Sequence, residues 1–133
     1  MGTNVHGWVE VNTVKETTEN IWFRIIEIDI LVECNYEVYG SLFGIRVKNG
    51  VVPIAPNRGL PNDLPEYYAE ELKGKSMVGV TWAYFEEIRE PLAELCKDPW
   101  LKGWKFILNS MDELQTRFGK GNVRIVVGFD NYG

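Results

Sequence analysis

The chain has 133 residues, of which 45% are hydrophobic and 13% aromatic, a composition that builds a packed core and excludes a disordered protein. Its net charge is −5 at pH 7, and without any run of lysine and arginine it has no surface suited to duplex nucleic acid. No apolar run approaches the roughly 20 residues of a membrane span and the N-terminus lacks a signal-peptide pattern, so we expect one cytoplasmic domain over 1–133 that contacts no membrane.

Two strands are predicted near the N-terminus. Valines alternate with side chains of the opposite face over 5–11, which is the period of a half-buried strand. Residues 21–28 are dense in β-branched and aromatic side chains and indicate a second strand. The polar residues 12–20 connect the two strands, so the pair is expected to form a hairpin.

A mostly apolar helix is predicted over 30–43, with Asp29 as its N-cap. Asp29, Glu33 and Glu37 make a narrow polar stripe, which favours a solvated face over a metal site because no histidine completes it. Asn35 lies inside the apolar arc of this helix. We expect its side chain to be buried and bonded to the following loop, since a buried amide without partners costs about 1–3 kcal/mol.

Residues 45–64 form a long loop, because Pro53, Pro56 and Pro61 exclude regular structure through much of it. The loop is too long and too apolar for a plain linker. Loops of this kind usually line a site or an interface, so we expect this one to contribute to function.

The second half of the chain alternates helices and strands. Helices are predicted over 65–73, 85–95 and 98–118, and strands over 77–84 and 122–129. The whole order predicts an α+β domain with a four-stranded, mixed or antiparallel sheet and helices packed on one face.

The helix predicted over 98–118 has the strongest pattern. Trp100, Trp104 and the apolar residues that follow fall on one side, which we expect to be buried against the sheet. Phe106 lies opposite this stripe among charged residues, and it is the clearest candidate for a subunit contact.

Four segments together resemble a set of short bacterial and phage proteins of unknown function. They are His6-Gly7-Trp8, the stretch NYEVYGSLFGIR at 35–46, the stretch RGLP at 58–61, and Thr81-Trp82 at the end of a strand. The resemblance spans most of the chain. It implies one compact domain in a bacterial or phage cytoplasm, and it assigns no function and no site.

Two arginines are the main candidates for ligand binding. Arg46 and Arg58 lie among apolar residues near glycines or prolines, and arginine in such surroundings pairs with carboxylate or phosphate. An internal carboxylate is the alternative partner for either arginine. We predict that both converge on an anion-accepting pocket near the end of the 30–43 helix, with candidate ligand-binding residues Asn35, Tyr36, Arg46, Asn57, Arg58 and Gly59 and candidate internal partners Glu37, Asp63 and Glu66.

The histidine and the cysteines offer little catalytic chemistry. His6 is the only histidine, and Glu10 on the same strand face could orient it as a general base, but no nucleophile motif accompanies it. Cys34 and Cys96 lie in apolar patterns without a second metal-ligand pair, so we expect two buried, reduced thiols. We assign no catalytic residue, metal or cofactor.

The function that these patterns favour is a non-catalytic binding domain that holds a small anionic, nucleotide-like ligand between the 30–43 helix and the 45–64 loop. Two alternatives remain open. One is a protein-interaction domain that acts through the loop and the helix face of Phe106, with homo-oligomers among its forms. The other is a small enzyme that uses His6 with Glu10.

Overall fold

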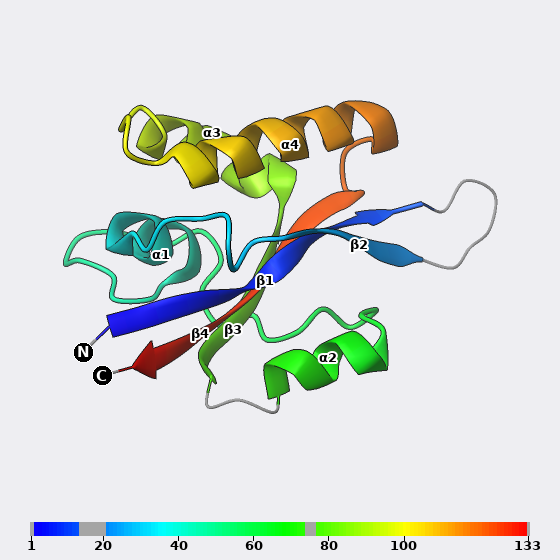
Figure 1. Cartoon of the computed structure of the whole chain (residues 1–133), viewed down its shortest axis with the longest axis horizontal. Coiled ribbons are helices and arrows are strands. Elements are labelled where there is room, and N and C mark those ends of the chain that lie inside the picture. The colour runs from blue at the N-terminus through cyan, green and yellow to red at the C-terminus, as the bar shows by residue number, and fades with distance from the viewer. Residues whose placement is uncertain (1, 14–20, 74–76, 133) are drawn as a thin grey trace.

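The sheet contains four antiparallel strands, and a computed structural model describes the chain over residues 2–13, 21–73 and 77–132. The strand order is β2-β1-β4-β3, so β1 and β4 lie at the centre and β2 and β3 at the edges (Figure 1). The predicted α+β class and four-stranded sheet are confirmed, and most of the predicted 12–20 connector lies outside the described residues. The strands are β1 (Gly2–Asn12), β2 (Trp22–Glu27), β3 (Met77–Tyr84) and β4 (Val123–Tyr132).

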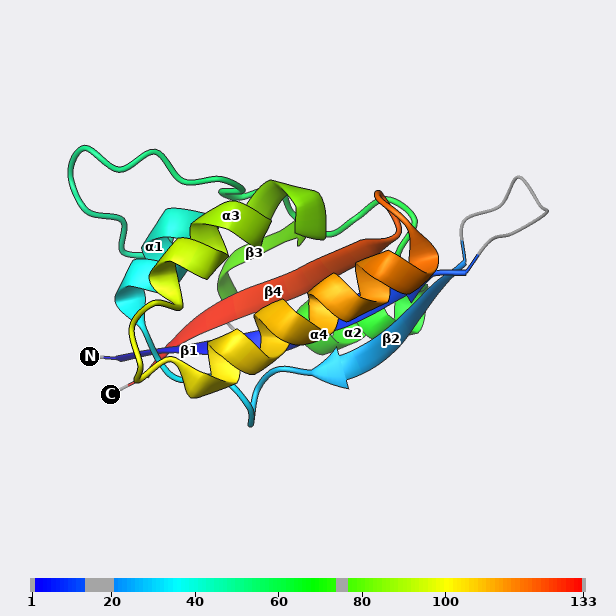
Figure 2. The same ribbon diagram turned by 90° about the horizontal axis from the view of Figure 1, so that it is seen from above.

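Three helices cover one face of this sheet, and the fourth packs on the other. α1, α3 and α4 meet Val127 and Phe129 of the sheet in the main core. α2 lies on the opposite face, where Leu72 joins Trp8 and Val126 in a second, smaller cluster. Figure 2 shows α3 and α4 in front of the sheet and α2 behind it. The helices are α1 (Tyr36–Phe43), α2 (Glu66–Lys73), α3 (Phe85–Leu95) and α4 (Lys102–Phe118).

α1 is much shorter than the helix predicted over 30–43. Asn35 has an extended backbone with φ −143°, and its side-chain oxygen accepts a hydrogen bond from Val38 N at 2.9 Å. Asn35 is therefore the N-cap, and the predicted cap at Asp29 is wrong. Its amide caps α1 instead of anchoring the following loop. Gly44 ends the helix in the left-handed conformation, with φ 75°.

Two acidic residues of the predicted polar stripe bind other elements, which keeps the chain before α1 out of a helix. Asp29 accepts a hydrogen bond from the backbone N of Gly7 at 2.9 Å. The carboxylate of Glu33 accepts bonds from the backbone N of Gly103 at 2.8 Å and of Trp104 at 3.2 Å. These amides lie in the first turn of α4, where N–H groups have no partner within the helix and the helix dipole favours a negative charge.

α4 begins at Lys102, although the pattern predicted a start at residue 98. The chain around Glu33 crosses the first turn of α4 so closely that a Cβ on Gly103 would lie 1.8 Å from Leu31 O. Trp104 is fully buried in the main core, as predicted. The prediction for Trp100 is wrong, because this residue precedes the helix and its side chain is 81% exposed.

Trp104→Ala should lower the free energy of unfolding by about 3–5 kcal/mol, because it empties a fully buried position in the main core. Trp100→Ala is the matched control and should change the free energy by less than about 0.5 kcal/mol, because that ring is exposed. Urea unfolding followed by circular dichroism measures both variants. A loss below about 1 kcal/mol for Trp104→Ala would contradict the packing of α4 on the sheet.

Glu33→Ala should lower the free energy of unfolding by about 1–2 kcal/mol, because it removes the carboxylate that caps α4. Glu37→Ala is the control: its carboxylate contacts exposed Lys48 at 3.5 Å, and its loss should cost no more than about 1 kcal/mol. Thermal unfolding of the two variants compares them directly. A Glu37→Ala loss as large as that of Glu33→Ala would show that capping is not the cause.

Candidate functional site

Arg46, the first predicted ligand-binding arginine, lies beside the start of β1. Its Nε donates a hydrogen bond to Thr3 Oγ1 at 2.9 Å. The guanidinium also lies over the ring of Tyr36, 4.6 Å from the ring centroid. The side chain therefore ties the loop after α1 to β1 and to the first turn of α1.

Arg58, the second predicted ligand-binding arginine, forms an internal ion pair. Its Nη1 and Nη2 donate to the two carboxylate oxygens of Glu87 at 2.8 and 2.6 Å. This forked geometry is the strong form of the arginine–carboxylate pair, and it lowers the pKa of Glu87. The guanidinium also lies 5.2 Å from the ring centroid of Trp82. The partner is thus internal, as the alternative prediction held, although Glu87 was not among the carboxylates named for it.

The two arginines do not converge on one pocket, so that prediction is wrong. Arg46 contacts Thr3, which pairs with Asn131, whereas Arg58 lies over Trp82, which pairs with Val126. Five residues of one strand separate these positions, or about 17 Å at the rise of a β-strand.

The segment from Asn57 to Gly59 does not form an anion-binding turn. The backbone N of Arg58 donates to Thr81 Oγ1 at 3.1 Å, and the N of Gly59 donates to the carbonyl oxygen of Val80 at 2.9 Å. Both amides are therefore used to hold the loop along the outer edge of β3. Asn57 itself is exposed.

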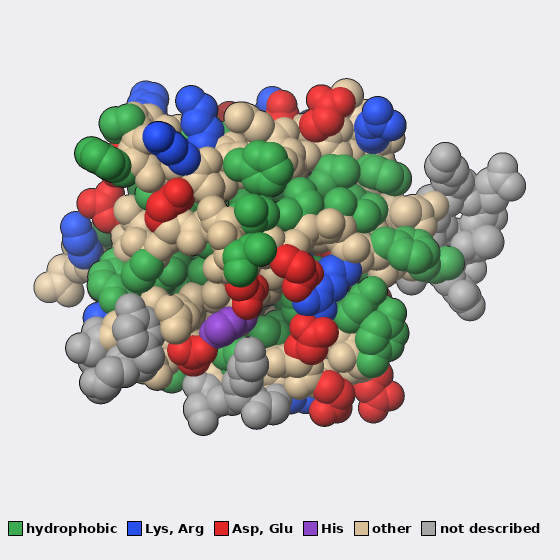
Figure 3. Space-filling model, in the orientation of Figure 1, with side chains coloured by type: hydrophobic (Ala, Val, Ile, Leu, Met, Phe, Trp, Pro, Cys, Tyr) green, Lys and Arg blue, Asp and Glu red, His purple; other side chains and the backbone are tan. Residues whose placement is uncertain are grey.

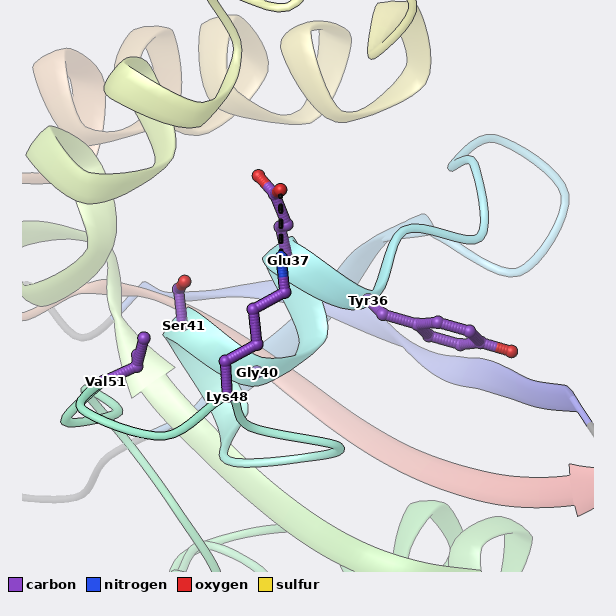
Figure 4. A pocket seen from close by; sticks show the side chains of 6 residues that line it. All are labelled: Tyr36, Glu37, Gly40, Ser41, Lys48 and Val51. Atoms are coloured by element: carbon purple, nitrogen blue, oxygen red, sulfur yellow. Dashed lines mark ion pairs between the residues drawn. The ribbon is translucent and has the colours of Figure 1, made fainter.

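A shallow pocket of about 170 Å³ does lie where the ligand was expected, between α1 and the following loop. Glu37 and Lys48 form an ion pair across it at 3.5 Å, and the aromatic ring of Tyr36 points away from the other lining side chains (Figure 4). Neither predicted arginine lines it. An exposed ion pair of this kind is weak, and the pocket offers no other charged group to recognise a ligand.

His6 is held by two aspartates rather than by Glu10, so the predicted pairing with Glu10 is wrong. Its Nδ1 lies 2.9 Å from a carboxylate oxygen of Asp29, and its Nε2 contacts Asp130. In Figure 3 the histidine, in purple, is flanked by acidic side chains. Both ring nitrogens therefore contact carboxylates, and Glu10 does not orient this imidazole.

Glu10 belongs instead to a buried charge cluster on the α2 face of the sheet. It lies directly opposite Arg124 in the β1–β4 pair, and Arg124 Nε lies 3.4 Å from its carboxylate. Arg124 also donates to Asp63 at 2.7 Å, and its guanidinium lies 3.7 Å from the ring centroid of Trp22. Glu10 and Arg124 are almost fully buried, so this cluster holds two charges away from water.

The environment of this cluster shifts the protonation of Glu10. Burial raises the pKa of its carboxyl, and the neighbouring charge of Arg124 opposes that rise only in part. A buried ion pair gives little or no net stability over apolar side chains of similar volume, because both charges lose their hydration. Carboxyl groups with a perturbed pKa occur in functional sites and in structural ion-pair networks, so the surface beside this cluster bears on its role.

A pocket of about 430 Å³ opens beside this cluster, and we identify it as the candidate site. Trp82 and Tyr84 form an aromatic wall, with their ring centroids 5.0 Å apart and nearly perpendicular. Arg124 lines the pocket, and its guanidinium lies 5.9 Å from the ring centroid of Trp82. The remaining lining residues come from the end of the long loop and are Pro61, Asn62 and Asp63.

Most residues of this pocket were missed by the sequence analysis. The signal that marks Arg124 is a single charged residue in the middle of the apolar strand sequence VRIVV, and Glu10 has the same position in VEV. Two opposite charges at interior strand positions indicate a buried pair. Their pairing becomes visible only when β1 and β4 are known to be neighbours.

Other predicted residues have clear positions. Phe106 is half exposed and lines an apolar groove between α4 and β2. Cys96 is buried, and burial raises the pKa of its thiol. Cys34 is exposed, contrary to prediction, because the chain is not helical there. Across residues 2–13, 21–73 and 77–132, no group of three or more His, Cys, Asp and Glu side chains could hold a metal ion.

No protein-family model, curated protein or solved structure matches the chain. In the part of the chain that the structure describes, no helix has the length and apolar character needed to cross a membrane. The candidate site therefore stands on its own geometry and chemistry.

Glu10→Gln should change how stability depends on pH. Because the pKa of Glu10 is raised in the folded state, folding takes up a proton between the ordinary glutamate pKa and the raised value. The free energy of unfolding of the wild type should therefore fall as pH rises through that window, relative to Glu10→Gln. Urea unfolding of both proteins at a series of pH values measures the difference. Glu70→Gln, an exposed position on α2 outside both proposed binding surfaces, should track the wild type, and a constant difference for Glu10→Gln would contradict the raised pKa.

Proposed function

We propose that the chain is a non-catalytic binding domain for a small nucleotide-like ligand, held in the pocket of Trp82, Tyr84 and Arg124. The observation that carries this proposal is the junction of an open aromatic wall with a buried guanidinium. Binding sites commonly combine apolar walls with a few fixed polar groups and a group of perturbed pKa. The proposed site uses the end of the 45–64 loop but lies away from α1.

The shape of the pocket supports a planar ligand. Trp82 and Tyr84 are both partly exposed, and an aromatic ring of a ligand can pack against them. Asn62 adds an exposed amide at the rim, which matches the donors and acceptors on the edge of a nucleobase. Asp63 beside it is held by Trp22 and Arg124.

The charges near the pocket support an anionic group on the same ligand. Arg58 lies over the ring of Trp82, and Arg124 approaches the same ring from within the pocket. The side chain of Arg58 is about one quarter exposed, so an incoming phosphate can compete with Glu87 for its forked donors. The sequence-based prediction of an anionic ligand at Arg58 is therefore kept in this proposal.

The non-catalytic assignment is supported by the surroundings of the titratable groups. Both ring nitrogens of His6 contact carboxylates, and Glu10 is enclosed by Arg124 and the indole N–H of Trp8. Neither of these two residues lines the pocket of Trp82, Tyr84 and Arg124. From the resemblance to bacterial and phage proteins, we also propose a bacterial or phage origin and a cytoplasmic location.

A thermal-shift screen over nucleotides, nucleosides and inorganic phosphates tests the proposal. A nucleotide that binds should raise the melting temperature of the wild type, since any ligand of the folded state stabilises it by mass action. Tyr84→Ala should abolish the shift, and Arg58→Lys should reduce it because lysine lacks the forked donors.

Tyr67→Ala is the matched control, because Tyr67 is an exposed tyrosine of α2 outside the pocket. It should leave the shift intact. The proposal is overturned if no nucleotide raises the melting temperature, or if the shift is unchanged in both Tyr84→Ala and Arg58→Lys. A shift with inorganic phosphate equal to that with nucleotides would remove the role of the aromatic wall.

A further inference from the structure

β2 is an edge strand, and no strand of the described residues pairs with its outer side. It neighbours β1 alone in the sheet of the described residues. The backbone N of Thr13 donates to the carbonyl oxygen of Ile21 at 3.1 Å, so Ile21 directs its backbone groups toward β1. Phe23 lies two residues after Ile21 in the same register, so its backbone groups also point toward β1. Trp22 and Arg24 therefore direct their N–H and C=O groups away from the sheet.

This edge also carries apolar side chains that water reaches. Ile21, Phe23 and Ile25 are 45%, 49% and 49% exposed. An open edge with exposed apolar residues is a pairing site that monomeric proteins usually block with charge, proline or a covering segment.

The apolar surface continues from β2 onto α4. Ile25, Ile26, Phe106 and Leu114 line a groove of about 390 Å³ between the strand and the helix. Figure 3 shows hydrophobic side chains gathered between α4 and β2, on the face toward the viewer. The edge and the groove thus form one surface, which we name the β2 surface.

We propose that the β2 surface binds a second copy of this chain, with the two β2 strands antiparallel about a two-fold axis at Phe23. A two-fold interface must be complementary to itself. With the axis at Phe23, the outward backbone groups of Trp22 in one copy lie opposite those of Arg24 in the other. The two-fold axis generates this Trp22–Arg24 pair twice, and in each pair both N–H groups donate to the carbonyl oxygen opposite. Phe23 faces its own copy across the axis, and Ile21 lies opposite Ile25, the residue at which the register with β1 shifts, which brings the three exposed apolar residues together.

The pattern of apolar and charged residues favours this register. Moving the axis to Arg24 would also match outward backbone groups, but it would place the exposed, apolar Ile21 opposite the charged Glu27. The Arg24 guanidinium does not decide between the two registers, because it already pairs with Glu27 and Glu71 of its own copy.

The helices fit the same axis. A two-fold axis perpendicular to the joined sheet places the two α4 helices antiparallel on one face, each with its groove toward the other. Glu113 and Arg117 on the rim of the groove are one helical turn apart and opposite in charge. An antiparallel arrangement of two such helices can bring the acidic residue of one copy toward the basic residue of the other, so the charges of this rim are compatible with a two-fold interface.

Light scattering coupled to size exclusion on the full chain tests the association. The wild type should have twice the monomer mass of 15.3 kDa. Phe23→Glu should be monomeric, because it places two like charges at the axis, and circular dichroism should show it folded since the side chain is half exposed. Val52→Glu is the matched control: Val52 is exposed in the loop after α1, and this variant should remain dimeric.

Oxidative cross-linking tests the register in a Cys34→Ser background, which removes the exposed native thiol. Phe23→Cys should form a disulfide-linked dimer, since residues facing each other without hydrogen bonds have Cα atoms about 4.5 Å apart, within reach of a disulfide. Ile25→Cys, equally exposed, should not, because residue 25 faces residue 21 of the other copy. The inference fails if the wild type is a monomer, if Phe23→Glu stays dimeric, or if Ile25→Cys cross-links as readily as Phe23→Cys. These outcomes do not depend on the proposed ligand.

Discussion

The antiparallel pairing of β1 with β4 decides which side chains meet across the sheet, and most features of the molecule follow from it. The two strands approach so closely at Gly7 that a Cβ there would lie 2.0 Å from Val126 O. Their register places Glu10 opposite Arg124 on the α2 face of the sheet. The main core on the other face and the charge cluster on this one are therefore two consequences of one strand pairing.

The charge cluster is costly to build, and this cost is the strongest reason to link it to function. Glu10 and Arg124 are both removed from water, and the raised pKa of Glu10 shows that its partner does not fully compensate for the lost hydration. Asp63 connects the pair to the long loop, and Trp22 covers the guanidinium. The sheet thus holds a rigid polar group at the edge of the pocket that Trp82 and Tyr84 open to solvent.

The two edges of the sheet differ in the segments that contact them. Along β3, the long loop donates backbone bonds from Arg58 and Gly59, so this edge is covered. Along β2, no described strand pairs with the outer side, and Phe23 and Ile25 are half exposed. The covered edge borders the proposed ligand pocket, and the open edge carries the proposed interface between copies. Ligand binding and self-association therefore use separate parts of one sheet.

The sequence by itself determined the α+β class, the four strands and the buried stripe of α4, because period-two and helical spacing depend on local chain geometry. It also marked Arg58 and Phe106 as unusual. It misplaced the start of α1, because Asp29 and Glu33 bind Gly7 and the first turn of α4, which are distant in sequence. Only the tertiary structure decided that Glu10 meets Arg124 and that Arg46 and Arg58 lie apart. Strand order and register determine which of these residues become neighbours. Both depend on packing between segments that are distant in sequence, and the local pattern of one segment does not encode that packing.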